Sequence, residues 1–291
     1  MNAALISGVR SFNRLVTERV GALNDHYLTR DRPLGEARLL WEIGSGIDVR
    51  ALRERLGLDS GYLSRLLRSL ESAGLVAVET STADRRVRTA RLTAAGRRER
   101  KLLDRRSDDL ASSFLGPLSD SQRERLVGAM GEVERLLTAS LVELHVVDPA
   151  GADAQFCLGE YFAEIDRRFE AGFDPALSIT GIDELRHPAG VFVVATLRSE
   201  PIGCGGVKLA GTWALLKRMW VAPSARGLGI GRRLLADLEQ RARAHGARSV
   251  RLETNRALTE AIGLYRAQGY REVEPFDDEP YADHCFEKRV S

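Results

Sequence analysis

The residues that could do chemistry are concentrated in one glycine-rich stretch, 225–235, with the sequence Ala-Arg-Gly-Leu-Gly-Ile-Gly-Arg-Arg-Leu-Leu. A strand-like run, 213–221, precedes it, and a helix-like run follows it. Glycines let the backbone approach a ligand closely, and the first turn of a helix offers unpaired N–H groups and partial positive charge. This order predicts a pyrophosphate site, with Arg226 and Arg232 at its rim. An ordinary tight strand-to-helix connection would contain the same glycines.

The loop differs from two other phosphate-binding loops. No Gly-Lys-Ser/Thr ends it, as in a Walker loop, and its glycine spacing does not fit the Rossmann fingerprint. Arg226, Gly229 and Gly231 form the pattern Arg-x-x-Gly-x-Gly, which resembles the acetyl-CoA signature of the GNAT N-acetyltransferases. Residues 216–223 resemble that family's strand before the loop. Residues 261–270, with Leu-Tyr-x-x-x-Gly-aromatic, resemble its second motif.

The resemblance implies a binding site for acetyl-CoA, the cosubstrate of that family. In GNAT proteins the strand before the loop separates from its neighbour and offers free backbone groups to the pantetheine arm. A backbone N–H near Val221 would then polarise the thioester carbonyl. The implied cofactor-binding residues are Met219, Trp220, Val221, Arg226, Gly227, Leu228, Gly229, Ile230, Gly231, Arg232 and Asn255.

Acetyl transfer to an amine also needs an acid for the leaving thiolate and a base for the amine. Tyr265 matches the family's motif tyrosine, which commonly protonates the sulfur, and an ordinary phenol pKa of ~10 suits that role. Glu253, on a predicted strand facing the loop, is the candidate base, and a water chain could replace it. The alternatives are a core aromatic residue and a structural carboxylate. The acidic, aromatic segment 275–284 either lines an acceptor site for a cationic amine or is a solvated loop.

Length and composition set outer bounds. A chain of 291 residues suggests about two domains, and 44% hydrophobic with 29% charged residues is typical of a globular chain. No apolar run approaches the ~18 residues of a membrane span, and no signal-peptide pattern begins the chain, which predicts a cytoplasmic protein. The three cysteines are widely separated and the five histidines scattered. Neither a disulfide framework nor a metal site is therefore predicted.

Charge is distributed unevenly along the chain. Residues 1–140 hold 24 Lys and Arg against 19 Asp and Glu, whereas residues 141–291 hold 19 against 22. Much of the basic excess lies between residues 85 and 106. A basic stripe of this kind can contact phosphates, or it can be a solvated helix face paired with neighbouring acids.

The first half reads as a helix over 1–30, three shorter helices, a hairpin and two long helices. The expected N-caps are Asp48 and either Asp59 or Ser60, and the expected helix-ending glycines are Gly57 and Gly74. Two short helices joined by a glycine turn, the second bearing hydroxyls and arginines, suit helix-turn-helix docking in a major groove. The hairpin that follows, over 75–92, has arginines at its tip.

The hairpin tip, Asp84-Arg85-Arg86, and the following residues 91–96 resemble the MarR family of transcription regulators. In that family the aspartate braces the wing and the arginine reaches the minor groove. A winged helix used only for dimerisation is the alternative. The predicted DNA-binding residues are Ser60, Tyr62, Ser64, Arg65, Arg68, Asp84, Arg85, Arg86 and Arg88. The terminal helices would form a two-fold homodimer that binds a palindromic operator in double-stranded DNA.

The expected fold is multidomain: a mainly-α winged helix-turn-helix domain for DNA binding and dimerisation over 1–140, and a GNAT-like α/β domain over 141–291. The second domain is expected to be a mixed sheet with crossover helices, its first helix covering 153–173 with Phe156 facing inward. The expected protein is both a transcription regulator and an acetyl-CoA-dependent N-acetyltransferase acting on an amine of a small molecule or lysine. Alternatively, the second domain senses acetyl-CoA and changes DNA affinity with little catalysis.

Overall fold

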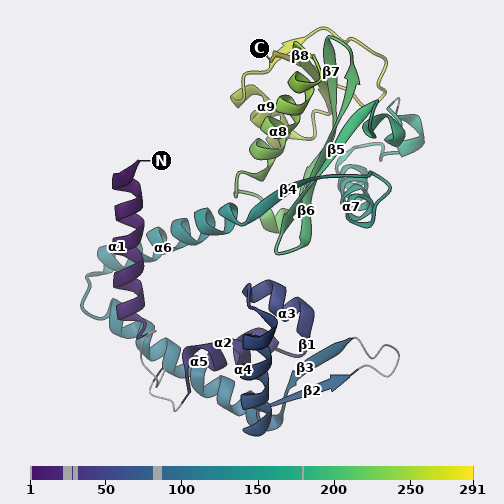
Figure 1. Ribbon diagram of the computed structural model, residues 1–291. Coiled ribbons are helices and arrows are strands. Elements are labelled where there is room, and N and C mark those ends of the chain that lie inside the picture. Colours follow the sequence, from purple (N-terminus) through teal and green to yellow (C-terminus); the bar gives the residue numbers. More distant parts are fainter. Residues whose placement is uncertain (1, 22–27, 29–31, 81–86, 179, 291) are drawn as a thin grey trace. The chain divides into compact units, whose positions relative to one another are not determined.

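The computed structural model describes residues 2–21, 28, 32–80, 87–178 and 180–290. These residues form two compact units, Met1–Gly128 and Ala129–Ser291 (Figure 1). The division falls within helix α6 (Asp120–Ser140), whereas the boundary predicted from the sequence lies at the end of that helix. The domain limits 1–140 and 141–291 therefore stay a prediction.

The first unit is mainly helical and contains a small sheet. Its elements are α1 (Ala3–Arg19), α2 (Leu34–Ile43), β1 (Ile47–Asp48), α3 (Val49–Leu56), α4 (Ser60–Ser72), β2 (Val76–Thr80), β3 (Arg88–Leu92), α5 (Ala94–Leu115) and the start of α6. The sheet has the order β1-β3-β2, and both pairs are antiparallel. Helix-turn-helix and hairpin follow one another in the predicted order.

Local interactions fix the helix-turn-helix as the sequence predicts. The Asp48 carboxylate accepts hydrogen bonds from the backbone N–H groups of Arg50 and Ala51, at 2.8 and 3.1 Å. Asp59 caps α4 in the same way. Gly57 takes the left-handed conformation that ends α3. The leucines of α4 are buried at Leu63, Leu66, Leu67 and Leu70. Its opposite face is therefore free.

Helix α1 is shorter than expected, and none of its side chains is buried. It ends at Arg19, not at residue 30, because Val20 closes it and Gly21 has a φ of +67°. Its apolar residues are exposed at Leu5, Ile6, Val9, Phe12, Leu15 and Val16. This much exposed apolar surface on one helix is unusual for a monomeric domain.

The second unit is a seven-stranded mixed sheet with helices on both faces (Figure 1). Its elements are β4 (Val142–Val147), α7 (Ala152–Arg168), β5 (Gly190–Leu197), β6 (Glu200–Ala210), β7 (Trp213–Val221), α8 (Ile230–Ala244), β8 (Ser249–Thr254), α9 (Thr259–Ala267), β9 (Arg271–Val273) and β10 (His284–Arg289). The strand order is β4-β5-β6-β7-β8-β10-β9, in which β7 and β8 are parallel and the other pairs antiparallel. This is the predicted mixed sheet with crossover helices.

Two cores cover the two faces of this sheet. Leu234 and Leu238 of α8 pack with Leu216 and Leu252 of the strands in one core. On the other face, Cys157 and Leu158 of α7 pack with residues of β5, β6 and β7. Helix α7 ends at Arg168, five residues before the predicted end, because Phe169 is extended. The inward placement of Phe156 was wrong: this ring is 51% exposed.

Strand β7 has two irregularities. Its parallel pairing with β8 stops at Leu216↔Leu252, so the rest of β7 has no partner on that side. Its pairing with β6 shifts register between Cys204 and Gly206, which leaves Arg218 and Met219 opposite one residue. Arg218 has a φ of +58°, which is unusual for a residue with a side chain. Such a bulge bends a strand and redirects its side chains.

Candidate functional site

A groove of about 510 Å³ opens where β7 loses its pairing with β8. Most of the predicted cofactor-binding residues line it: Met219, Trp220, Val221, Arg226, Gly227, Gly229, Ile230, Gly231 and Arg232. Leu228 and Asn255 do not. Leu228 packs against the core of α8. The Asn255 amide donates to the Tyr281 carbonyl and accepts from the Ala257 N–H.

The glycine loop lines this groove through Gly227, Gly229 and Gly231. Gly227 and Gly229 have φ values of +82° and +76°, which a residue with a side chain rarely adopts. Gly229 is the N-cap of α8, and no side chain caps the helix. A Cβ on Gly231 would lie 3.3 Å from the Leu264 side chain. The uncapped first turn can therefore accept an anion at close range.

A buried carboxylate, Glu164 of α7, holds the rim of the groove. It accepts hydrogen bonds from Arg226 Nη2 at 2.7 Å, Trp220 Nε1 at 3.0 Å and Arg168 Nη1 at 3.2 Å. Burial by itself would raise the pKa of Glu164, but the bonds from Arg226 and Trp220 outweigh it and keep that pKa below its ordinary value. The Arg226 side chain is therefore fixed in place by an ion pair.

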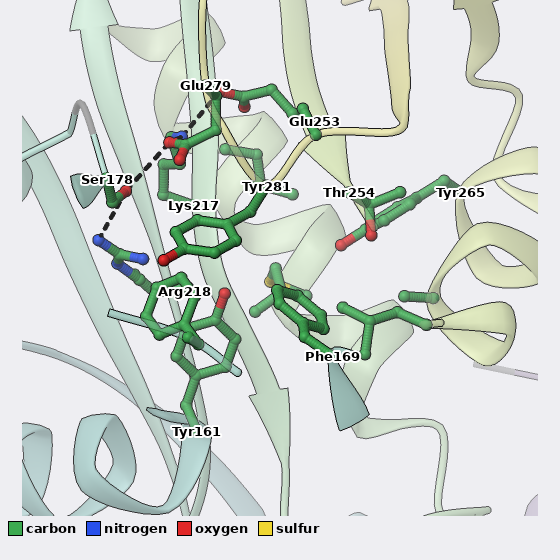
Figure 2. A pocket seen from close by; sticks show the side chains of 16 residues that line it. Tyr161, Phe169, Ser178, Lys217, Arg218, Glu253, Thr254, Tyr265, Glu279 and Tyr281 are labelled. Atoms are coloured by element: carbon green, nitrogen blue, oxygen red, sulfur yellow. Dashed lines mark hydrogen bonds and ion pairs between the residues drawn. The ribbon is translucent and has the colours of Figure 1, made fainter. Parts of the chain in front are cut away.

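A second, smaller pocket of about 80 Å³ adjoins the groove. Its 16 lining side chains are drawn in Figure 2. The groove and the pocket share Tyr161, Met219, Leu258, Ala261 and Tyr265. A thioester in the groove and a nucleophile in the pocket would thus meet beside Tyr265.

Tyr265 of α9 is 5% exposed and lines both cavities. Burial raises the pKa of its hydroxyl well above the ordinary phenol value. Its hydroxyl lies on the same side of the pocket as that of Thr254 (Figure 2). A phenol with a raised pKa stays protonated at neutral pH, so it serves as a hydrogen-bond donor.

Glu253, the predicted base, lies in the pocket and is bound to Lys217. The Lys217 Nζ donates to Glu253 Oε1 at 2.7 Å and to Glu279 Oε2 at 2.8 Å. Burial raises the pKa of Glu253 to about 7, against the opposing effect of Lys217. Among the residues that the structure describes, the second oxygen of each carboxylate is buried and has no hydrogen-bond partner. Burial disfavours the charged form of Lys217, but the two carboxylates outweigh it and raise its pKa.

The segment 275–284 lines this pocket through Glu279 and Tyr281. The negative charge that this segment brings to the cavity is balanced, because Glu279 forms an ion pair with Lys217. Of the two interpretations of this segment, the structure supports the pocket lining. An excess of negative charge for a cationic amine is not what the lining provides.

The predicted DNA-contact residues lie on the free face of α4 and at the start of β3. Ser60, Tyr62, Ser64, Arg65, Arg68 and Arg88 are all exposed. A hollow of about 610 Å³ lies beside them, lined also by Arg50 and Arg53 of α3. Asp84, Arg85 and Arg86 lie outside the described residues. Together the exposed arginines form a basic surface that suits a phosphate backbone.

Three kinds of feature are not found in the part of the chain that the structure describes. No group of His, Cys, Asp and Glu there could hold a metal ion. Cys157, Cys204 and Cys285 are free and buried. No helix in the described ranges is long and apolar enough to cross a membrane.

Comparison with known proteins decides the family of the second unit. Residues 159–270 match the model of the acetyltransferase (GNAT) family. An IAA acetyltransferase from Azospirillum brasilense is 38% identical over 117 residues, which are 39% of this chain and 76% of the relative. The chain belongs to the GNAT acetyltransferase family. An uncharacterized N-acetyltransferase from Schizosaccharomyces pombe is 33% identical to this chain over 98 residues, which are 32% of this chain and 59% of that protein.

The first unit matches a second family. Residues 31–87 match the model of the MarR family. The solved structure of wild-type MarR in its apo form from E. coli aligns over 43% of this chain and 93% of its own, at 21% identity and a TM-score of 0.39. By the two family models, the chain joins a MarR-family domain to an N-acetyltransferase domain of the GNAT family.

Sequence reasoning missed several residues of the GNAT domain that the structure brings to the site. Glu164 and Arg168 come from α7, Lys217 and Arg218 from β7, and Ser178 from the segment before β5. Lys217 and Arg218 lie near the end of β7, a strand that the sequence already placed at the site. Their charges in that strand could therefore have identified them as site residues. The positions of Glu164 and Ser178 depend on packing and carry no local pattern.

Proposed function

We propose that this protein is a MarR-like transcription regulator and an acetyl-CoA-dependent N-acetyltransferase whose acceptor is an amine of a small molecule or of lysine. The observation that carries the enzymatic half is the junction of the two cavities at Tyr265. One cavity has the backbone surface that a nucleotide thioester needs. The other is a confined, buried pocket with ionisable groups, as an amine acceptor needs.

We infer that acetyl-CoA binds with its pyrophosphate on the N–H groups of the Gly227–Arg232 loop. Its pantetheine arm would pair with the free edge of Met219, Trp220 and Val221. An N–H near Val221 would then donate to the thioester oxygen and stabilise the tetrahedral intermediate. The uncapped start of α8 and the unpaired edge of β7 support this placement.

In the transfer step, the amine nitrogen bonds to the acetyl carbon and the bond from that carbon to sulfur breaks. Glu253, with a pKa of about 7, removes the amine proton directly or through water. The Tyr265 hydroxyl donates to the departing sulfur. Because burial raises the pKa of Tyr265, we assign it hydrogen bonding to the thiolate before complete proton transfer. The products are an amide and coenzyme A.

The experiment that tests this proposal is acetyl-CoA-dependent thiol release by the purified protein against polyamines, amino acids, aminoglycosides and lysine peptides. Release with one class, at a rate well above the acceptor-free rate, is expected. If no acceptor supports release while calorimetry shows acetyl-CoA binding, the result favours the alternative, in which the second domain is an acetyl-CoA sensor. That alternative requires that DNA and acetyl-CoA change each other's affinity by the same factor.

For the MarR-family domain, we propose that Ser60, Tyr62, Ser64, Arg65 and Arg68 contact bases and phosphates in a major groove. Asp84 would brace the wing, while Arg85, Arg86 and Arg88 would contact the flanking minor groove. The exposed face of α4 and the basic hollow beside α3 support this assignment. Selection of duplexes from a random-sequence pool would test it. Recovery of a palindromic consensus is expected, and recovery of unrelated sequences would contradict specific recognition.

We further propose that the protein is a two-fold homodimer, since α1 exposes six large apolar side chains and α6 exposes Val127, Met130, Leu136 and Leu137. Sedimentation equilibrium should give the dimer mass. A Phe12→Glu variant should shift the protein toward monomer, because a charge on a covered apolar face is costly. A monomeric wild-type protein at micromolar concentration would refute this assembly.

A further inference from the structure

Arg218 is a buried cation in the smaller pocket beside the groove, which we call the acceptor pocket. The residue is 8% exposed and lines the cavity. Its Nη2 donates to the Ser178 hydroxyl and to the Thr180 carbonyl, both at 3.2 Å. Its guanidinium carbon lies 5.9 Å from the ring centre of Tyr161 and 5.1 Å from that of Phe162. The Ser178 hydroxyl in turn donates to Glu279 Oε2 at 3.0 Å. These contacts hold the side chain in place, but among the described residues none of them is a direct ion pair.

The bulge in β7 places the Arg218 side chain in the pocket. Side chains alternate between the faces of a strand, and Lys217 already points to the α7 side, where it meets Glu279. The bulge at Arg218, with its φ of +58°, puts the next residue on the same side, against Tyr161 of α7. Two consecutive cations therefore face one cavity.

The two cations differ in how their charges are balanced. Lys217 is bound by two carboxylates, Glu253 and Glu279. Arg218 has no carboxylate within ion-pair distance among the residues that the structure describes. A buried charge without a counter-ion is costly. An anionic ligand in the cavity would relieve that cost, and a guanidinium suits the oxygens of a carboxylate or similar group.

The remaining wall of the pocket is aromatic. Phe173 lies with its ring centre 4.6 Å from that of Tyr281 and 6.0 Å from that of Phe169. Tyr161 lines the same cavity (Figure 2). This wall suits an apolar or flat body between the acidic end of a ligand and the end near Tyr265.

We propose that the acceptor is a small amine that also bears an oxyanion group, and that Arg218 is the residue that selects it. The acidic group binds at the Arg218 guanidinium, the body lies on the aromatic wall, and the amine points to Tyr265. This inference rests on the proposed acetyl transfer and narrows its acceptor from any amine to an amino acid or an analogous amino acid phosphonate.

The test uses acceptors matched in all but the acidic group. The pairs are L-phenylalanine with phenethylamine and L-alanine with ethylamine, and 1-aminoethylphosphonate represents a different oxyanion. For each, kcat/KM is measured with wild type, Arg218→Gln, Arg218→Lys and the control Arg241→Gln, whose arginine pairs with Asp237 outside both cavities. Binding of each acceptor to the protein loaded with coenzyme A is measured by calorimetry, which needs no turnover.

The wild type should prefer the acid-bearing member of at least one pair by about tenfold or more, the value of a charge-assisted hydrogen bond. Arg218→Gln should abolish that preference by lowering kcat/KM for the acid-bearing member more than for its neutral partner, and Arg218→Lys should retain part of it. A general loss with both members would assign Arg218 a purely structural role and overturn the proposal. So would tighter binding of the neutral amines to wild type. Selective binding without turnover would instead uphold Arg218 and refute the acetyl transfer.

Discussion

The groove and the acceptor pocket of the GNAT domain are built from different parts of the polypeptide. The groove presents backbone: three glycines, an uncapped helix start and an unpaired strand edge. The pocket presents side chains, with two cations, two carboxylates and five aromatic rings. A backbone surface binds one invariant ligand without depending on nearby side chains. A side-chain surface can be altered residue by residue, so specificity belongs to the pocket.

The largest effect should come from Tyr265, where the two cavities meet. Tyr265→Phe removes only the hydroxyl and should lower kcat by about 1,000-fold, within the range for proton-transfer groups. Acetyl-CoA affinity, measured by calorimetry, should stay within about twofold of wild type. Tyr270→Phe is the matched control, because Tyr270 is equally buried but lines neither cavity. An unchanged kcat would remove Tyr265 from the mechanism.

The second-largest effect should come from Glu253, the candidate base in the pocket. If Glu253 is the base, kcat/KM should rise as the pH passes about 7, and Glu253→Gln should lose this limb and about 100-fold in kcat. Glu279→Gln, at the other carboxylate on Lys217, should keep the limb. Because the folded protein holds the Glu253 proton more tightly than the unfolded chain does, the stability from this group falls as pH rises through about 7. Wild type should therefore lose more stability than Glu253→Gln as the pH rises from about 4.5 to about 7, and equal losses would contradict the raised pKa.

A substitution in the groove should change the affinity for acetyl-CoA without changing the pH dependence that arises in the pocket. Gly229→Ala places a side chain at a φ of +76° and should weaken acetyl-CoA binding about tenfold or more, at an unchanged pH profile. Gly246→Ala is matched: its φ is +93°, at the other end of α8, and a Cβ there would also be in open space. Both should lower the Tm by a similar amount. Equal losses of affinity would mean that the loop contributes only through stability.

The smallest effect on either cavity should come from the MarR-family domain. Arg53→Ala and Arg68→Ala should each reduce the slope of log affinity for DNA against log salt concentration by about 1, the value for one lost phosphate contact. Acetyl-CoA binding should not change. Arg241→Ala serves as the control for charge removal. A slope unchanged in both variants would place the phosphate contacts elsewhere.

The contrast between groove and pocket also explains how much could be predicted from the sequence. Local patterns identified Asp48, Asp59 and the glycines, because caps and turns depend on a few consecutive residues. The groove was predictable since its loop is continuous in the chain. Glu253 and Tyr265 were expected at the site, but the rest of the pocket was not predictable, because Ser178, Lys217 and Glu279 come from separate segments. Residues 275–284 could only be described as two alternatives until Glu279 was seen to bind Lys217.

The errors have a physical cause too. The helix predicted over 153–173 followed apolar spacing past Arg168, although Phe169 and Phe173 belong to the aromatic wall of the pocket. Periodicity does not distinguish an apolar residue that covers a core from one that lines a cavity. The helix predicted over 1–30 likewise continued beyond Gly21, whose φ of +67° marks the end of α1.

The bulge in β7 makes Arg218 a one-residue insertion in an otherwise regular strand. Lys217 and Trp220 contact residues of the α7 side, while Leu216 and Met219 pack toward α8. If Arg218 were deleted, these four neighbours would follow the ordinary alternation and keep their faces. An in-frame loss of a single codon would therefore remove the selecting charge and relax the strand together. In a lineage of such enzymes, acceptor preference could change through a deletion in strand length, with every other pocket residue conserved.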